Sequence, residues 1–202
     1  MDPLVLAEVR RRIADEDEAL TAARSRAPST APSPEIGALL AWAAATTQAR
    51  AAVEIGASGG VSGLWIARGL APRGVLTSVE ADPYAHGLAS EAFEGSGTTE
   101  RVRSIQGEPG TVLPRLSDAG YDLVLLQGRA AEYPDHLAHA RRLLRPGGLL
   151  VARRVLRRGE DSDALARFVD ALAEDREDFT TTVLDVDEGL VLATRLAEDK
   201  GE

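Results

Sequence analysis

The chain has 202 residues, no cysteine and a formal net charge of −9, which suits one domain of ordinary size and excludes disulfides, thiolate metal sites and cysteine nucleophiles. The negative charge disfavours nucleic acid as a partner, because phosphates repel it, and no apolar run reaches the roughly 20 residues of a membrane span. We therefore expect a cytoplasmic protein with neither a nucleic-acid nor a membrane partner.

The first third of the chain is predicted to be helical. Apolar residues at helical spacing indicate one helix over residues 3–24, and three prolines between residues 26 and 34 indicate a loop. Ser33 and Pro34 are typical of a helix start, and we expect this second helix to run to about residue 49. We assign residues 1–30 to an N-terminal helical arm and residues 31–202 to the main domain.

From residue 51 onward, short apolar runs alternate with helical segments, which is typical of a parallel sheet covered on both faces. We predict strands at 51–55, 75–80, 102–106, 121–127 and 149–156, and helices at 62–70, 83–93, 110–117, 134–144 and 162–173. Residues 145–148, Arg-Pro-Gly-Gly, indicate a sharp turn into the fifth strand.

The end of the chain has a different pattern. Residues 179–186 and 190–196 are rich in Thr, Val and Leu, and only Asp187-Glu188-Gly189 separates them. A loop this short cannot make a parallel crossover, so it predicts an antiparallel hairpin. The expected fold is α/β, with a doubly wound, seven-stranded, mostly parallel sheet that ends in an antiparallel C-terminal hairpin.

A glycine-rich stretch follows the first predicted strand and reads Glu54-Ile-Gly56-Ala-Ser58-Gly59-Gly60-Val-Ser62. Glycines allow a ligand to approach the backbone closely, and the start of the next helix offers free N–H groups. Glu80 ends the second strand, where a carboxylate can accept hydrogen bonds from a ribose. Together they favour a nucleoside-containing ligand. A plain tight turn and a solvated strand end are the alternatives.

The spacing of these residues narrows the choice of ligand. A dinucleotide fingerprint needs glycine where the chain has Ser58 and Val61, and the lysine of a nucleotide-binding P-loop is absent. A dinucleotide-dependent oxidoreductase would also leave the terminal hairpin unexplained. We rank it last among the alternatives.

The order of motifs resembles class I S-adenosylmethionine-dependent methyltransferases. The matching motifs are Glu54-x-Gly56, Glu80, Gly107-Glu108, Tyr121-Asp122 and Leu-Arg-Pro-Gly-Gly148. Residues 33–40 and 62–67 look like the catechol-type O-methyltransferase family (family 3), in an actinobacterial branch. The resemblance implies O-methyl transfer to a small molecule, with S-adenosylmethionine as the cofactor.

The resemblance also implies a set of cofactor-binding residues. Those expected around the methionine part are Glu54, Gly56, Gly60 and Ser62, and Ser58 and Gln127 complete that side of the site. Glu80 is expected at the ribose, and Gly107 and Glu108 at the adenine.

The chain departs from the family at the metal site. Members that use magnesium or calcium have an Asp at the end of strand four and an Asp-Asn pair on strand five. Here these positions are Gln127 and Arg153-Arg154, and the nearby catalytic lysine is replaced by Ala130. Arginine is a permanent cation without an acceptor atom, so it repels a metal ion. We predict no catalytic metal.

The sequence identifies no general base. The candidates for a catalytic role are His136, Arg153 and Arg154. Five arginines near the predicted site either hold an acidic group of the substrate or are solvated and paired: Arg129, Arg153, Arg154, Arg157 and Arg158. Because the metal ligands are replaced, a protein that binds S-adenosylmethionine or S-adenosylhomocysteine without catalysis is the main alternative. We expect a homodimer in which the first helix packs on the partner subunit.

Overall fold

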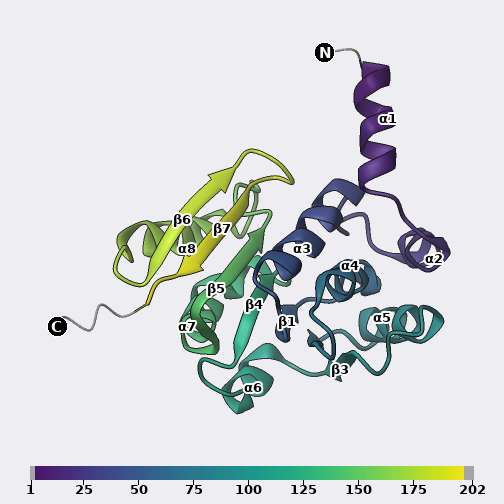
Figure 1. The fold of residues 1–202 in the computed structure, drawn as a ribbon. Helices are drawn as coiled ribbons and strands as arrows, with labels where there is room; N and C mark the ends of the chain where they lie inside the picture. The colour runs from purple at the N-terminus through teal and green to yellow at the C-terminus, as the bar shows by residue number, and fades with distance from the viewer. Residues whose placement is uncertain (1–2, 198–202) are drawn as a thin grey trace.

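The computed structural model describes residues 3–197, so residues 1–2 of the predicted arm and 198–202 of the predicted domain lie outside it. One seven-stranded sheet has the order β3-β2-β1-β4-β5-β7-β6 (Figure 1). Its strands are β1 (Ala51–Ile55), β2 (Val75–Glu80), β3 (Val102–Gln106), β4 (Tyr121–Leu126), β5 (Leu144–Arg153), β6 (Phe179–Leu184) and β7 (Leu190–Arg195). Strands β1 to β5 are parallel, and β7 is antiparallel to both β5 and β6. The predicted fold class is confirmed.

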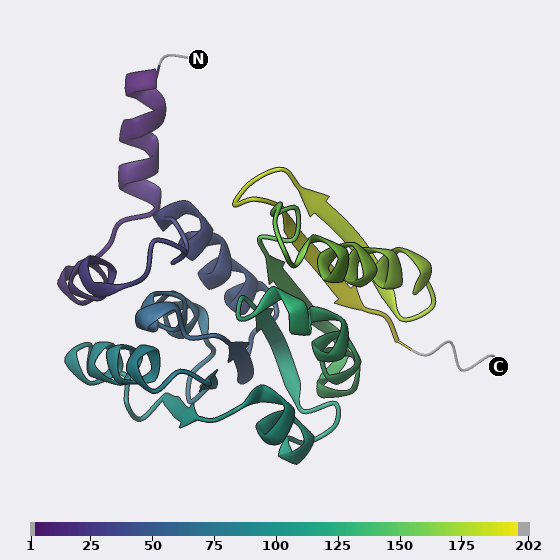
Figure 2. The same cartoon turned by 180° about the vertical axis from the view of Figure 1, so that it is seen from behind.

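Helices cover both faces of this sheet (Figures 1 and 2). They are α1 (Pro3–Ile13), α2 (Glu18–Arg26), α3 (Pro34–Thr46), α4 (Val61–Gly69), α5 (Pro83–Gly95), α6 (Pro109–Val112), α7 (Tyr133–Leu143) and α8 (Ser162–Glu174). Helices α2 to α5 pack on one face, and α6 to α8 pack on the other. Within residues 3–197 no helix has the length and apolar character needed to cross a membrane.

The core lies in two layers because successive strand residues point to opposite faces. In β1, Val53 and Ile55 join the cluster beneath α7 and α8, whereas Ala52 joins the cluster beneath α3 and α4. The buried carboxyl of Glu54 therefore lies on the α4 face, where its hydrogen-bond partner Ser62 is also found. This alternation places the acidic side chain of Glu54 near the end of β1 without interrupting the apolar core on the opposite face.

The single first helix predicted over residues 3–24 is wrong. The structure has two helices, α1 and α2, because the Asp17 carboxylate accepts a hydrogen bond from the Leu20 N–H and starts a new helix there. Helix α2 packs against α4 and α5, whereas α1 stands clear of the body (Figure 1). Helix α3 ends at Thr46, short of the predicted residue 49, because Gln48 has a left-handed φ of 49°.

Three further boundaries differ from the sequence prediction. Strand β5 begins at Leu144, so residues 145–148 continue the strand past an irregularity in its pairing with β4. It ends at Arg153, because Arg154 has a left-handed φ of 61°. The helix predicted at 110–117 is only α6 and a 3₁₀ turn over 113–115, which contains Pro114. The terminal hairpin is confirmed, with a loop over residues 185–189.

Candidate active site

The carboxyl ends of four parallel strands meet at one edge of the sheet. Backbone hydrogen bonds join Gly56 N to Val79 O (2.9 Å), Gln127 N to Ile55 O (3.0 Å) and Gly107 N to Glu80 O (2.9 Å). The tips of β1, β2, β3 and β4 are thus held together. In doubly wound sheets, ligands bind at this edge, near the place where the strand order reverses.

Two glycines in the loop after β1 have conformations that a side chain would not allow. Gly56 has a φ of 89°, and a Cβ there would lie 2.8 Å from the Cα and N of Gly128. Gly60 has a φ of 88°, and its Cβ would lie 2.7 Å from the Cβ of Ala92. The loop can therefore pass tightly between Gly128, just after β4, and α5, and it leads directly into the start of α4.

Glu54 is completely buried at the end of β1. Its carboxyl oxygens accept hydrogen bonds from the hydroxyls of Ser62 (2.6 Å) and Ser78 (2.7 Å). Burial raises the pKa of Glu54 to about 8, the two hydroxyls oppose that rise, and the negative charge of Glu80 adds to it. Glu80 gives this edge of the sheet a negative charge, and Glu54 adds a second one when it loses its proton, which suits a cationic ligand.

Glu80 lies at the tip of β2, half-buried, and its carboxylate faces the glycine loop. It accepts hydrogen bonds from the backbone N–H groups of Ala57 (2.9 Å) and Asp82 (3.1 Å). Gly107 follows β3 beside it, and the exposed Glu108 pairs with Arg129 from the loop after β4. The predicted ribose and adenine residues therefore line neighbouring strand tips.

Gln127 and Arg153 join this edge from β4 and β5. The amide nitrogen of Gln127 donates to Gly56 O (2.6 Å) and Ser62 Oγ (2.5 Å), and its oxygen accepts from Arg153 Nη1 (2.7 Å). Arg153 is only 1% exposed and makes a two-pronged ion pair with Asp187 from the hairpin loop. Gln127 thus contacts the glycine loop directly, and Arg153 contacts Gln127.

The other arginines near the site point elsewhere. Arg154 pairs with Glu188, Arg157 pairs with Asp161, and Arg129 pairs with Glu108 and Glu132. Arg158 is exposed. Carboxylates of the chain itself therefore satisfy four of the five arginines, which supports the interpretation that these arginines are paired rather than substrate-binding.

His136 and Tyr133 lie on α7, in the opposite half of the core from Glu54. The His136 ring is 3% exposed, its Nε2 is 3.5 Å from Glu132, and burial lowers its pKa to about 4. A base of such low pKa is poorly matched to proton abstraction at neutral pH. The Tyr133 hydroxyl lies 3.1 Å from Leu126 O and 3.0 Å from Arg153 O, where it ties β4 to β5.

The donor atoms at the predicted metal position do not fit a divalent cation. Magnesium and calcium need several oxygen ligands, usually from carboxylates. Here the Gln127 oxygen is already bound to the guanidinium of Arg153, a permanent positive charge at the same place. Across residues 3–197, no three acidic, histidine or cysteine side chains are grouped so that they could hold a metal ion.

Sequence reasoning missed three residues of this network: Ser78, Asp187 and Thr30. Ser78 could have been found, because it lies two residues before Glu80 and pairs in register with Glu54 on the neighbouring strand. In the sequence, Asp187 is only part of a predicted turn. The Thr30 carbonyl accepts from Arg153 Nη2 at 3.2 Å, although the two residues are 123 positions apart in the chain. No local pattern marks such contacts.

The strand order, the reversed final strand and the glycine loop between two acidic strand tips define a class I methyltransferase fold. A family model described as O-methyltransferase matches residues 7–196. A relative from Mycobacterium sp. (strain JLS), named "Putative O-methyltransferase", is 38% identical over 193 residues, which cover 89% of this chain and 87% of the relative. The chain therefore belongs to the O-methyltransferase family.

Solved structures agree with this assignment. The O-methyltransferase TomG from Streptomyces achromogenes, involved in tomaymycin synthesis and solved with S-adenosylmethionine, has a TM-score of 0.82 and 29% identity, over 91% of this chain and 92% of TomG. The cofactor-bound Rv0187 from MTB has a TM-score of 0.85 and 28% identity, over 96% of each chain. An O-methyltransferase from Bacillus cereus in complex with SAH has a TM-score of 0.84 over 93% of this chain and 97% of its own, and at 22% identity it shows the shared fold alone.

Proposed function

We propose that this chain binds S-adenosylmethionine at the tips of β1 to β4 and transfers its methyl group to a hydroxyl of a small molecule without a catalytic metal. The observation that carries the proposal is the pair Gln127–Arg153, which puts a guanidinium where metal-dependent relatives have carboxylates. The negative charge and the absence of cysteine further favour a cytoplasmic setting.

The residues present fit the cofactor. Glu54 and Glu80 supply negative charge for a ligand that carries a sulfonium and an ammonium group. Gly56 and Gly60 keep side chains out of the loop that passes beside it, and Ser58 and Ser62 belong to the same turn. When bound, the cofactor supplies a methyl group activated by the positive sulfur. The protein's own contribution is to hold that group in line with the acceptor and to exclude water.

Thermal unfolding with and without ligands tests the proposal. S-adenosylmethionine at about 100 times its dissociation constant should stabilise the protein by about 2.7 kcal/mol, a rise in Tm of about 5–10 °C for a chain of this size. S-adenosylhomocysteine should act likewise, and EDTA should change neither the shift nor the rate of methyl transfer to phenols.

Each contrary result has a distinct meaning. A shift with NAD alone would overturn the cofactor assignment, and a rate that requires magnesium would overturn the metal-free proposal. Firm cofactor binding without methyl transfer to any acceptor would favour the binding-only alternative. Comparing neutral phenols with phenolic acids also tests whether the substrate is acidic, a prediction to which the paired arginines lend no support.

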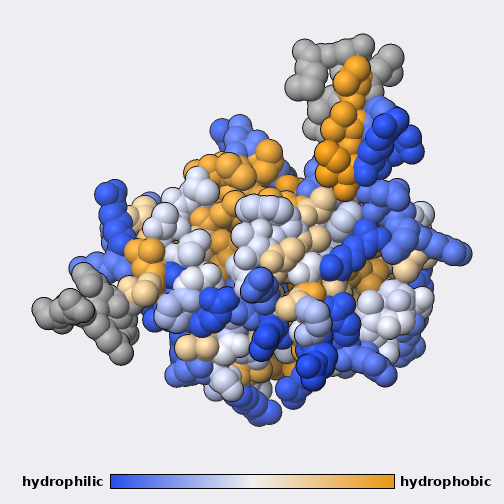
Figure 3. Space-filling view, viewed as in Figure 1, coloured by the Kyte–Doolittle hydropathy of each residue, from blue (hydrophilic) through white to orange (hydrophobic). Residues whose placement is uncertain are grey.

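We also infer a homodimer in which α1 packs on a second copy of the chain. Helix α1 has only 11 residues, too few for a stable isolated helix, and Val5, Val9 and Ile13 on it are 54%, 45% and 74% exposed. Figure 3 shows this apolar stripe along α1, and a second apolar patch over the tip of the hairpin. An apolar helix face that is exposed among the described residues suits a second copy of the chain as its partner.

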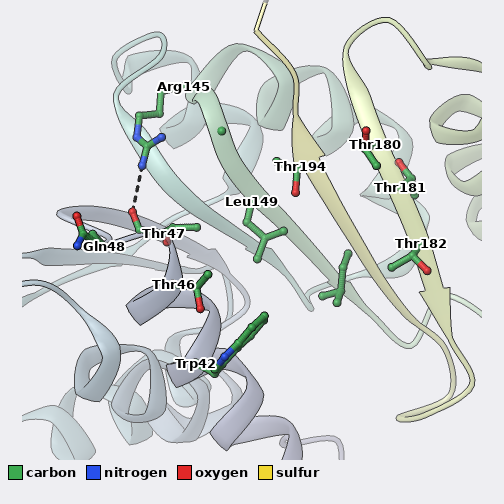
Figure 4. Close-up of a pocket in the computed structure, with 12 residues that line it drawn as sticks. Trp42, Thr46, Thr47, Gln48, Arg145, Leu149, Thr180, Thr181, Thr182 and Thr194 are labelled. Atoms are coloured by element: carbon green, nitrogen blue, oxygen red, sulfur yellow. Dashed lines mark hydrogen bonds between the residues drawn. The ribbon is translucent and has the colours of Figure 1, made fainter.

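A groove on the same chain offers a surface for that partner. It has a volume of about 640 Å³ and lies between α3 and the uncovered face of the hairpin, with Trp42 on one side and Thr180 and Thr182 on the other (Figure 4). Leu149 and Thr194 line its floor, and Trp42 is 58% exposed. In a symmetric dimer, α1 of each copy would contact this groove of the other copy, so the α1 stripe and the groove would be covered together.

The double variant Val9→Glu/Ile13→Glu should therefore be monomeric, because two charges on the apolar stripe cannot be buried against a partner without large cost. Sedimentation velocity at micromolar concentration is the measurement. Val75→Glu, at an exposed strand start away from α1, is the control and should leave the dimer intact. A wild-type chain that sediments as a monomer would refute the inference.

A further inference from the structure

A buried guanidinium lies at the end of β5. Arg153 is the largest fully buried side chain, and its guanidinium is held by Asp187 at 2.5 and 2.9 Å and by Thr30 O at 3.2 Å. Because Asp187 neutralises its charge and burial hides it, Arg153 is a poor binding group for an anionic substrate. Its remaining contact is with the Oε1 atom of Gln127.

That contact fixes which way the Gln127 amide points. A guanidinium can only donate hydrogen bonds, so the side of the amide that faces Arg153 must be the oxygen. The amide nitrogen is then forced toward the cofactor loop, where it lies 2.6 Å from Gly56 O and 2.5 Å from Ser62 Oγ. The Gly56 carbonyl, which can only accept, requires the same orientation, so Arg153 and Gly56 O hold the amide from its two sides.

The order of donors and acceptors continues to Glu54. Since Ser62 Oγ accepts from Gln127, its one proton is directed to Glu54 Oε2 at 2.6 Å. Ser78 donates to the other oxygen at 2.7 Å. Every donor along this path points toward Glu54, which is the arrangement that an ionised carboxylate requires, and hydrogen bonds in such a chain strengthen one another.

We propose that Arg153 is a positioning residue for cofactor binding, which acts through Gln127 and Ser62 to hold Glu54 as a correctly oriented hydrogen-bond acceptor for the cationic part of S-adenosylmethionine. The proposal rests on the proposed function, because it assumes that the cofactor lies against Glu54. In this chain the ion pair Asp187–Arg153 lies where metal-dependent relatives have their metal centre. The pair holds Gln127 in place, on the cofactor side of the site.

The decisive variant is Gln127→Glu, which keeps the shape of the side chain but puts an acceptor where the amide nitrogen lies, 2.6 Å from Gly56 O, 2.5 Å from Ser62 Oγ and 3.4 Å from Glu54 Oε2. The positioning role predicts that this carboxylate, which has no donor, captures the Ser62 proton and withdraws it from Glu54. We expect the Kd for S-adenosylmethionine to rise about ten- to a hundredfold, the loss of about one charged hydrogen bond, at a temperature where the variant is folded. A purely structural role for Arg153 predicts a changed Tm with an unchanged Kd in the folded variant.

Arg153→Gln is the second variant and should raise the same Kd by a similar factor. Arg141→Gln is the matched control. It also removes an arginine from an aspartate partner, Asp175, but Arg141 lies in the last turn of α7 and not at the strand tips. The Kd is measured by isothermal titration calorimetry with EDTA present. If Arg153→Gln does not fold, Gln127→Glu alone decides.

The outcomes separate this inference from the proposed function. Wild-type protein that binds S-adenosylmethionine, with Gln127→Glu binding it equally well, overturns the positioning role alone. Wild-type protein that does not bind S-adenosylmethionine overturns both. A raised Kd in folded Gln127→Glu, and a normal Kd in Arg141→Gln, supports the positioning role.

Discussion

The Glu80→Ala variant is expected to lose about a hundredfold in affinity for S-adenosylmethionine. The carboxylate at the tip of β2 accepts a hydrogen bond from the Ala57 N–H of the glycine loop at 2.9 Å, and in the proposed complex it would also accept from the ribose hydroxyls. Each charged hydrogen bond of this kind contributes about 1.5–3 kcal/mol, so losing the set costs two orders of magnitude in Kd. Calorimetric titration measures the change.

The control for this variant is Glu94→Ala, which removes the same charge from an exposed position on α5. It should bind the cofactor as the wild type does. Glu80→Gln should lie between the two, because the amide keeps one acceptor and most of the shape. A Glu80→Ala protein with the affinity of the wild type would remove this carboxylate from the cofactor site.

Cofactor binding should become tighter as the pH rises toward 8. Burial raises the pKa of Glu54 from its ordinary 4.5 to about 8, so in the free protein at pH 7 the group is largely protonated. A bound sulfonium favours the carboxylate, so binding below pH 8 releases a proton, and the affinity rises by up to about tenfold per pH unit. Above pH 8 the carboxylate is already ionised and the affinity should level off.

The same shift acts on the stability of the free protein with the opposite sign. A carboxyl whose pKa is higher in the folded state binds more protons when folded, so its favourable contribution to stability is complete below about pH 4.5 and is lost as the pH rises to 8.

Titration calorimetry of S-adenosylmethionine binding at pH 7, in two buffers of different ionisation enthalpy, measures the proton that is released on binding. Glu54→Gln should abolish that release, and S-adenosylhomocysteine, which lacks the sulfonium charge, should release less.

The sequence was sufficient for the sheet and for the residues that line its edge. Alternation of short apolar runs with helices predicts parallel strands, and the carboxyl ends of such strands must meet, so Glu54, Glu80 and Gln127 were expected near one another. The break between α1 and α2 is not visible in the apolar spacing, which continues from residue 3 to residue 24 across the cap at Asp17. Glu16, beside this cap, pairs with Arg24 and accepts from Trp65 Nε1 at 3.2 Å, a contact across 49 residues that no local pattern indicates.

The role of Arg153 could not be read from the sequence. Neighbouring strand residues point to opposite faces, but this rule does not say which of Arg153 and Arg154 is buried. In the structure, Arg154 pairs with Glu188, whereas Arg153 is buried and pairs with Asp187. Which carboxylate neutralises Arg153 depends on how far the hairpin folds back, a contact across 34 residues. The spacing of His136 on its helix favours a surface position, and this interpretation is wrong, because the ring is buried, at 3% exposure.

The Asp187–Arg153 pair also bears on how the molecule is made. The glycine loop is synthesised early, whereas Asp187, whose carboxylate neutralises the buried guanidinium of Arg153, belongs to the hairpin that is synthesised late. During synthesis the N-terminal portion emerges and begins to fold first. A nascent chain that has passed β5 but not yet the hairpin would hold an unneutralised cation at its sheet edge, so we expect the strand tips to reach their final arrangement only when translation is nearly finished.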